Sequence, residues 1–235
     1  VIHPAPRTTQ GRVRAGPACL RTSSAVALVP LAGMTEGRRL ASISLIYATT
    51  TPDWRQFDWA MNQAKTAGVH PLVVLSGTPK WLQPSPNPCP SSPEMAPPVN
   101  FSRWAAIAAA YVAHLNQAFP GLVQDFEIWN EPELQQSFCV ADNTDATRLS
   151  TYLSLYAAAA SAMRFTANQD GVKINIGGPT ISRLSLAPEW IAALLSNAQT
   201  APNVDFVSFH FYPTGLIQIQ GGMTWSSLYT RTQST

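Results

Sequence analysis

The run Pro71-Leu72-Val73-Val74-Leu75 decides the fold that this sequence predicts. An unbroken apolar run of this length is typical of a strand that is buried on both faces, as in a parallel sheet. Before it, Thr51-Pro52-Asp53 indicates a helix start and Gly68 a helix end, because proline suits the first helical position and glycine follows the last. The sequence from 51 to 75 therefore predicts a helix followed by a buried parallel strand.

The same alternation continues along the chain. We expect helices where apolar residues recur at helical spacing, at 104–115, 149–160 and Pro188–Ala198. Strands that alternate with helices of this length predict an α/β fold with a parallel sheet. The further strands are expected at Ser42–Tyr47, Leu122–Ile128, Val172–Ile176 and Asp205–Phe211.

Composition excludes several classes of protein. Apolar residues make up 46% of the 235 residues and charged residues only 12%, so the chain is neither disordered by composition nor short of core residues. No apolar run reaches the roughly 18 residues of a membrane span. The three cysteines and four histidines show no metal-ligand spacing, so we expect neither a metal site nor a cofactor.

Positive charge is concentrated at the start of the chain. Residues 1–40 hold six arginines against one glutamate, and the other 195 residues carry a net negative charge. They therefore offer no basic stripe for a nucleic acid. We expect residues 1–40 to be an irregular basic leader outside the core, and 41–235 to be one partial catalytic domain. The few lysines and the Pro- and Ser-rich loops favour an exported protein.

One stretch carries most of the functional information, namely Phe126-Glu127-Ile128-Trp129-Asn130-Glu131-Pro132. It places an amide and a carboxylic acid at the C-terminal end of a parallel strand, where the active site of a (β/α)8 barrel is built. A carboxyl group there can protonate the leaving oxygen of a glycoside while the amide binds a sugar hydroxyl.

This stretch resembles the acid/base strand of the retaining glycoside hydrolases of clan A. Three further motifs make the chain most similar to glycoside hydrolase family 39, the β-xylosidase and α-L-iduronidase group, over about residues 41–215. They are Thr78-Pro79-Lys80-Trp81, Gly177-Gly178-Pro179, and the run from Val204 to Tyr212. The resemblance implies a (β/α)8 TIM barrel that is incomplete here, with strands 2–6 present and strands 7–8 missing.

The resemblance also implies roles for single residues. Glu131 would be the general acid/base, and Asn130 would bind the sugar hydroxyl next to the anomeric carbon. His210 and Tyr212 would line the pocket, and Trp81 would offer an aromatic face to a sugar ring. Each role has a structural alternative: Glu131 could cap the next segment, His210 could be a core histidine, and Trp81 could anchor its proline-rich loop.

The second carboxylate of a retaining enzyme is harder to find. Glu127 precedes Glu131 by four strand residues, roughly 13 Å at about 3.3 Å per residue, whereas retaining enzymes need about 5–5.5 Å between the two carboxyls. Glu133 lies beyond Pro132, where the loop departs, so we do not expect it to be the second carboxylate either. No acidic residue follows Asp205, and the resemblance places the nucleophile on a seventh strand, so we expect this chain alone not to hydrolyse glycosides.

The interpretation as an enzyme on a β-linked oligo- or polysaccharide has two rivals. One is an endo-β-glycanase resembling the family 5 cellulases, and the other is a non-catalytic carbohydrate-binding relative. A separate expectation concerns Cys89 and Cys139, which follow neighbouring strands of the predicted sheet. Because loops after neighbouring parallel strands lie on one face, we expect these cysteines to form a disulfide.

Overall fold

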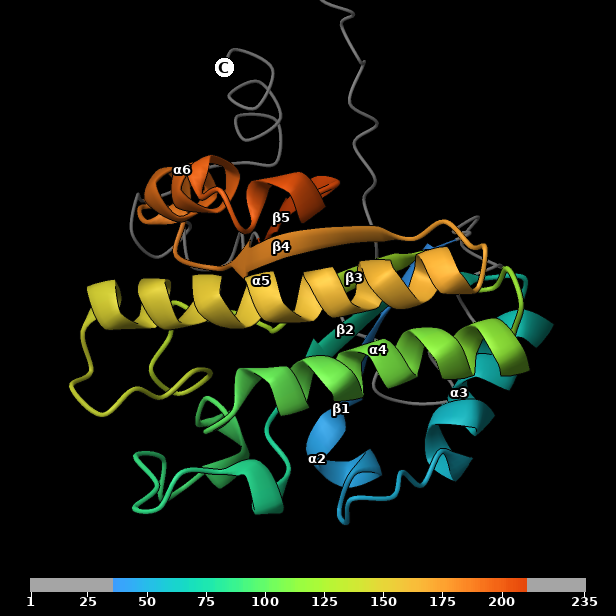
Figure 1. The fold of residues 1–235 in the computed structure, drawn as a ribbon, viewed down its shortest axis with the longest axis horizontal. Coiled ribbons are helices and arrows are strands. Elements are labelled where there is room, and N and C mark those ends of the chain that lie inside the picture. Colours follow the sequence, from blue (N-terminus) through green and yellow to red (C-terminus); the bar gives the residue numbers. More distant parts are fainter. Residues whose placement is uncertain (1–35, 211–235) are drawn as a thin grey trace, which may run out of the picture.

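The computed structural model describes residues 36–210. Their five strands form one parallel sheet in which the spatial order equals the chain order (Figure 1). Strands that are neighbours in sequence are thus neighbours in space, as in a segment of a (β/α)8 barrel. The strands are β1 (Glu36–Ser42), β2 (His70–Ser76), β3 (Asp125–Ile128), β4 (Asn175–Ile181) and β5 (Phe206–Phe209).

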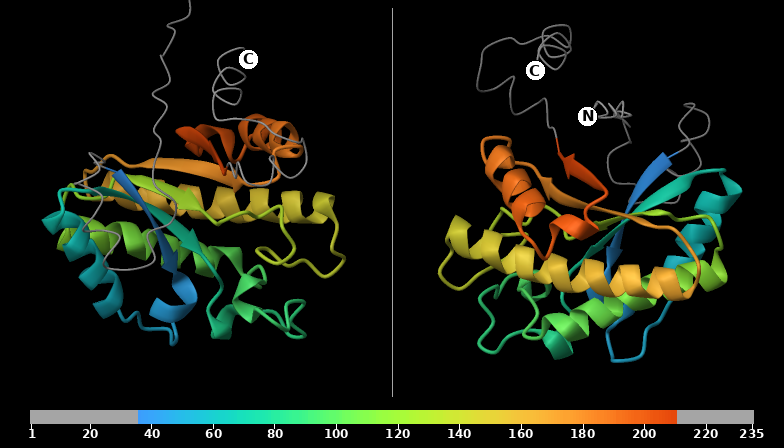
Figure 2. Two further views of the ribbon diagram at one scale, coloured as in Figure 1. Left: turned by 180° about the vertical axis from the view of Figure 1, so that it is seen from behind. Right: turned by 45° about the horizontal axis from the view of Figure 1, so that its top comes forward.

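Helices connect these strands, and the two longest pack against each other along one face of the sheet (Figure 2). Both begin with a capping side chain, because Asn100 and Thr144 each accept a hydrogen bond from the backbone amide three residues later. The helices are α2 (Ile43–Ile46), α3 (Arg55–Thr66), α4 (Phe101–Ala118), α5 (Asp145–Gln169) and α6 (Ala187–Ser196), with 3-10 turns η2 (Lys80–Leu82), η3 (Pro93–Met95) and η4 (Ala201–Asn203).

Large aromatic side chains fill the space between the sheet and its helices. Trp104, Trp129, Tyr152 and Trp190 are all fully buried or nearly so. Tyr152 of α5 also donates a hydrogen bond to the carbonyl of Ile128 at 3.2 Å, at the last residue of β3. The core therefore fixes the helices directly against the carboxyl ends of the strands.

The first strand lies earlier than the sequence predicted. The segment 42–47 was expected as a strand, but Ile43–Ile46 forms one helical turn, with both isoleucines buried. The strand is Glu36–Ser42, which pairs along its whole length with His70–Ser76. Residues 36–40 therefore belong to the sheet and not to a leader, whereas 1–35 lie outside the described residues.

The fourth strand is displaced in the other direction, since β4 was expected at 172–176 and runs from Asn175 to Ile181. It thus contains both glycines and the proline of the Gly177-Gly178-Pro179 motif. A β-carbon on Gly177 would collide with the ring of Phe206 on the neighbouring strand. Glycine is therefore required here by the close approach of a neighbour, which is a recognised role of glycine in strands.

The sheet is open within the part of the chain that the structure describes, because β1 pairs only with β2 and β5 only with β4. On β5, the side chains of Val207 and Phe209 are 43% and 55% exposed. Among residues 36–210, no helix combines the length and the apolar character that crossing a membrane requires.

Candidate active site

The carboxyl ends of the strands meet at one edge, where two predicted site residues come together. Glu131 follows the end of β3 by three residues, and His210 directly follows β5. Although β4 lies between these strands, His210 Nδ1 is 2.6 Å from Glu131 Oε1. The backbone amide of His210 also donates to the carbonyl of Ile181 at 2.8 Å. The residue that the resemblance made the acid/base is therefore bonded to the predicted pocket histidine.

This pair has the exposure that proton transfer needs. The side chains of Glu131 and His210 are each 16% exposed, so both are mostly shielded and neither is sealed from solvent. The imidazole N–H can donate to the carboxylate and so fix its orientation. A carboxyl group at a strand end, held by one neighbour and still accessible, can give a proton to a bound molecule or take one from it.

The backbone that carries this carboxylate adopts an uncommon conformation. Trp129 and Glu131 have φ values of 69° and 49°, in the left-handed region that residues with large side chains rarely enter. Such residues persist where the surrounding structure holds them, and they cluster at functional sites. Trp129 is held by its amide, which donates to the Leu75 carbonyl at 2.7 Å, and by its indole N–H, which donates to the Ser137 carbonyl at 2.6 Å.

The end of β4 contributes a further contact. The register between β4 and β5 shifts between Pro179 and Ile181, so Thr180 is the extra residue of a bulge. Its φ of 54° is again left-handed. Its hydroxyl oxygen lies 2.7 Å from the Pro179 carbonyl and 3.2 Å from the Trp129 carbonyl, so these two acceptors share one proton. Bulges re-aim side chains beside active sites, and this one brings Thr180 to the residue before Asn130.

Two other carboxylates near this edge are buried. Glu127 lies inside β3 with 3% of its surface exposed, and Glu133 is completely buried. Burial chiefly, and then the charges of Tyr156, Glu127 and Glu133, raise the pKa of Tyr152 well above its ordinary value. We expected no catalytic role for Glu133, and the structure shows it bonded to the loop after β4, a contact across 49 residues that no local pattern indicates.

Trp81 connects two loops at the same edge. Its indole N–H lies 3.1 Å from both the Tyr47 and the Thr49 carbonyl, and the Arg103 guanidinium lies 5.6 Å from its ring centroid. The side chain is half-buried. Trp81 therefore anchors the loop after β2 to the chain after β1, and its predicted contact with a sugar stays a prediction.

Two further predicted residues are only partly described. Asn130 is half-buried beside Glu131, and its role as a sugar ligand stays a prediction. Tyr212 lies outside the described residues. Within 36–210, no three side chains of the kinds that bind metals are grouped closely enough to hold an ion.

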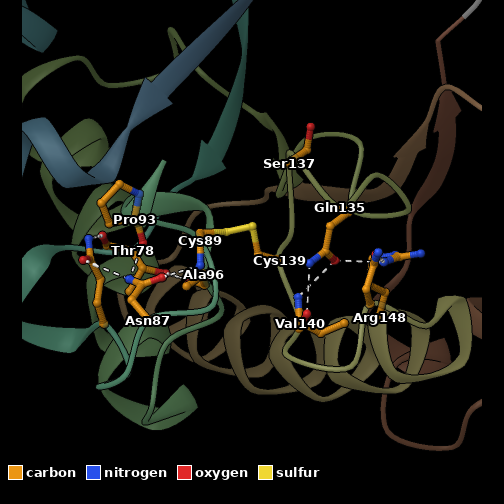
Figure 3. The surroundings of a disulfide bond; sticks show 12 residues. Thr78, Asn87, Cys89, Pro93, Ala96, Gln135, Ser137, Cys139, Val140 and Arg148 are labelled. Carbon is orange, nitrogen blue, oxygen red and sulfur yellow. Dashed lines mark hydrogen bonds between the residues drawn. A yellow bond between two sulfur atoms is a disulfide. The ribbon is translucent and has the colours of Figure 1, made fainter. Parts of the chain in front are cut away.

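A disulfide joins the loops that follow β2 and β3. The Cα atoms of Cys89 and Cys139 are 5.8 Å apart, and Figure 3 shows the bond between the two loops. The backbone supports the same junction, because the Cys139 amide donates to the Met95 carbonyl at 3.0 Å. In the loop after β3, the Gln135 side-chain oxygen accepts a hydrogen bond of 2.9 Å from buried Arg148 of α5. The loop that follows Glu131 is thus fastened at several points.

Solved structures that share this fold include glycoside hydrolases. A monomeric β-xylosidase from Caulobacter crescentus CB15 superimposes with a TM-score of 0.62 and 23% identity, over 81% of this chain and 38% of that one. A GH30 endoxylanase from Clostridium papyrosolvens C71 gives 0.58 and 16%, over 81% and 46%. These structures support the TIM-barrel fold, and this chain corresponds to less than half of each.

Sequence comparison gives the family. A β-xylosidase from Geobacillus stearothermophilus is 30% identical over 123 residues, which is 50% of this chain and 22% of that protein. A β-xylosidase from Caldicellulosiruptor saccharolyticus is 28% identical over 125 residues, 52% of this chain and 23% of that protein. The pattern of glycosyl hydrolases family 39 matches residues 41–229. This chain therefore belongs to glycoside hydrolase family 39.

Proposed function

We propose that this chain carries the acid/base side of the active site of a retaining β-glycosidase. The observation that carries the proposal is the contact between Glu131 and His210, 2.6 Å long, at the carboxyl edge of a parallel sheet. In the first step, Glu131 protonates the glycosidic oxygen as the leaving group departs and a second carboxylate bonds to the anomeric carbon. In the second, Glu131 takes a proton from a water molecule, whose oxygen bonds to the anomeric carbon and displaces that second carboxylate.

The proposed substrates are β-linked xylosides or short xylose oligomers. The support comes from the family and from the two relatives named as β-xylosidases. In this proposal Asn130 binds the hydroxyl next to the anomeric carbon. His210 orients Glu131, Tyr212 lines the pocket, and Trp81 presents an aromatic face to the sugar ring.

The nucleophile is proposed to lie outside the described residues. Glu127 is buried within β3 and Glu133 is bonded to the loop after β4, so neither is free to attack an anomeric carbon. Residues 206–235 contain no aspartate or glutamate. We therefore propose that a longer form of the protein supplies the second carboxylate.

The decisive experiment is Glu131→Gln in a form of the protein as long as its β-xylosidase relatives. Two aryl β-xylosides serve as substrates, one with a poor leaving group and one with an activated leaving group. General acid catalysis contributes about 10²–10⁴-fold, so we expect a loss of that order on the poor leaving group and a smaller loss on the activated one.

Glu189→Gln is the matched control, because Glu189 is an exposed carboxylate on α6. It should leave both rates unchanged. Equal losses on both substrates in Glu131→Gln would contradict the acid/base role. Binding of xylobiose without any hydrolysis, even in the longer protein, would favour a non-catalytic carbohydrate-binding relative.

A further inference from the structure

Glu133 lies two residues after Glu131 and is 0% exposed. Its Oε1 accepts three hydrogen bonds from the loop after β4: from the Ser182 amide at 2.6 Å, the Ser182 hydroxyl at 2.7 Å and the Arg183 amide at 2.9 Å. Its Oε2 is buried and has no hydrogen-bond partner within residues 36–210. Burying a carboxylate costs free energy of folding unless hydrogen bonds compensate for the lost water. The hydrogen bonds from the loop after β4 supply that compensation for Glu133.

Glu133 is also part of the turn that begins at Glu131. The amide of Leu134 donates to the Glu131 carbonyl at 3.1 Å, which closes a four-residue turn. Pro132 occupies the second position, where the fixed φ of proline is favoured, and Glu133 the third. Fixing the Glu133 side chain therefore fixes the turn whose first residue is the proposed acid/base.

The end of β4 thus holds the main chain on both sides of Asn130 and Glu131. On the N-terminal side, the Thr180 hydroxyl, which also bonds to the Pro179 carbonyl, lies 3.2 Å from the Trp129 carbonyl. On the C-terminal side, Ser182 and Arg183 bind Glu133. The left-handed φ values of Trp129 and Glu131 are unfavourable, and two hydrogen-bonded anchors that flank them explain how this conformation is kept.

We infer that Glu133 is a positioning residue: through the loop after β4, its carboxylate holds Glu131 where it meets His210. Glu133 acts through its neighbours, because its accepting oxygen is bonded to Ser182 and Arg183. The catalytic consequence rests on the function proposed above. The contact between Glu131 and His210 can, however, be measured without any turnover.

The test uses proton NMR of the 235-residue chain. A ring N–H of His210 that donates to a carboxylate gives a separate downfield resonance, which is assigned by its loss in His210→Gln. We compare Glu133→Ala, Glu133→Gln and Ser182→Ala with the exposed control Glu189→Gln. Alanine removes all three hydrogen bonds, glutamine keeps an accepting oxygen, and Ser182→Ala removes one of the three.

We expect the resonance to be lost in Glu133→Ala, shifted in Ser182→Ala and retained in Glu133→Gln and in the control. A folded Glu133→Ala chain with an unchanged resonance would overturn the inference. So would a loss in Glu133→Gln as complete as that in Glu133→Ala, because the oxygen would then not be what matters. If Glu133→Ala gives an unfolded spectrum, Ser182→Ala decides, and an unchanged resonance there overturns the inference.

This experiment separates the inference from the proposed function. If Glu131→Gln has no effect on hydrolysis but Glu133→Ala still abolishes the His210 resonance, the acid/base role fails and the positioning role stands. If Glu131→Gln abolishes hydrolysis of the substrate with the poor leaving group but the His210 resonance is unchanged in Glu133→Ala and Ser182→Ala, only the positioning role fails. Absence of the resonance from the unaltered chain would contradict the contact itself.

Discussion

The hydroxyl oxygen of Tyr152 lies 2.5 Å from the point that a β-carbon on Gly178 would occupy. The same hydroxyl donates to the Ile128 carbonyl at 3.2 Å, one residue before the left-handed Trp129. The missing side chain in β4 thus lets α5 approach closely enough to bond to the end of β3. Glycine is needed here to leave room for a neighbour.

Gly178→Ala is therefore expected to destabilise the fold by overpacking, at a cost of about 1–3 kcal/mol. Tyr152→Phe should relieve most of this overpacking, because the next atom of Tyr152 lies 3.8 Å from the added carbon and the nearest other atom, Cε2 of Tyr156, lies at 3.4 Å. The free energy of unfolding is measured in urea for both single variants and for the double variant. The double variant should be more stable than the sum of the single losses predicts, whereas strict additivity would show that the hydroxyl is not the obstacle.

Removing the disulfide should weaken the fold. Cys89 and Cys139 are 50 residues apart in sequence, and a loop of that size corresponds to about 4 kcal/mol in the chain-entropy view, the upper end of the typical range for a disulfide. We expect Cys139→Ser to lower the free energy of unfolding by up to that amount and Cys19→Ser to leave it unchanged. Peptide mass spectrometry of the unreduced protein should find residues 89 and 139 linked, and two free thiols there would contradict the pairing.

Alkali should destabilise the fold between pH 10 and pH 12. Burial raises the pKa of Tyr47 from 10.0 to about 12, and burial first of all raises the pKa of Tyr111 well above the same ordinary value. The unfolded chain loses these protons from about pH 10, whereas the folded chain keeps them, so the free energy of unfolding falls as pH rises through this range.

Thermal unfolding followed across this range tests the expectation, and Tyr47→Phe is the matched variant. It removes one buried phenol and should make the decline with pH shallower. A decline equally steep in Tyr47→Phe would show that Tyr47 is not one of the groups responsible.

Trp81→Phe separates the two roles of Trp81. Phenylalanine keeps an aromatic face but removes the indole N–H that lies 3.1 Å from the Tyr47 and Thr49 carbonyls. We expect a loss of stability of about 0.5–1.5 kcal/mol, together with an affinity for xylobiose close to that of the unaltered chain. Trp81→Ala should lower both the stability and the affinity for xylobiose. Unchanged xylobiose affinity in Trp81→Ala would leave Trp81 as a loop anchor only.

The elements with a strong period could be predicted from the sequence, and the short apolar runs could not. Helices α4 and α5 lie where the apolar stripes indicate them. The run at 42–47 was misread because a six-residue apolar segment does not distinguish a strand from a helical turn. Ile43 and Ile46 are three residues apart, so a helical turn places both side chains on one face, where they are buried in the core.

Contacts over long sequence distances set the other limit. Glycines and a proline at 177–179 indicate a turn by local rules, yet they lie within a strand because Phe206 and Tyr152 occupy the space beside them. The proximity of Glu131 and His210 was implied only by the family resemblance. Nothing local marks Glu133, since its partners come 49 and 50 residues later.

The bulge at Thr180 also has an evolutionary consequence. Side chains alternate along a strand, so deletion of this one residue would restore a regular ladder and shift every later residue by one position. The Ser182 and Arg183 amides would then no longer face Glu133. Homologues should therefore vary more freely in the residue types at this strand end than in its length, and insertions or deletions between 179 and 183 should be the changes that selection removes first.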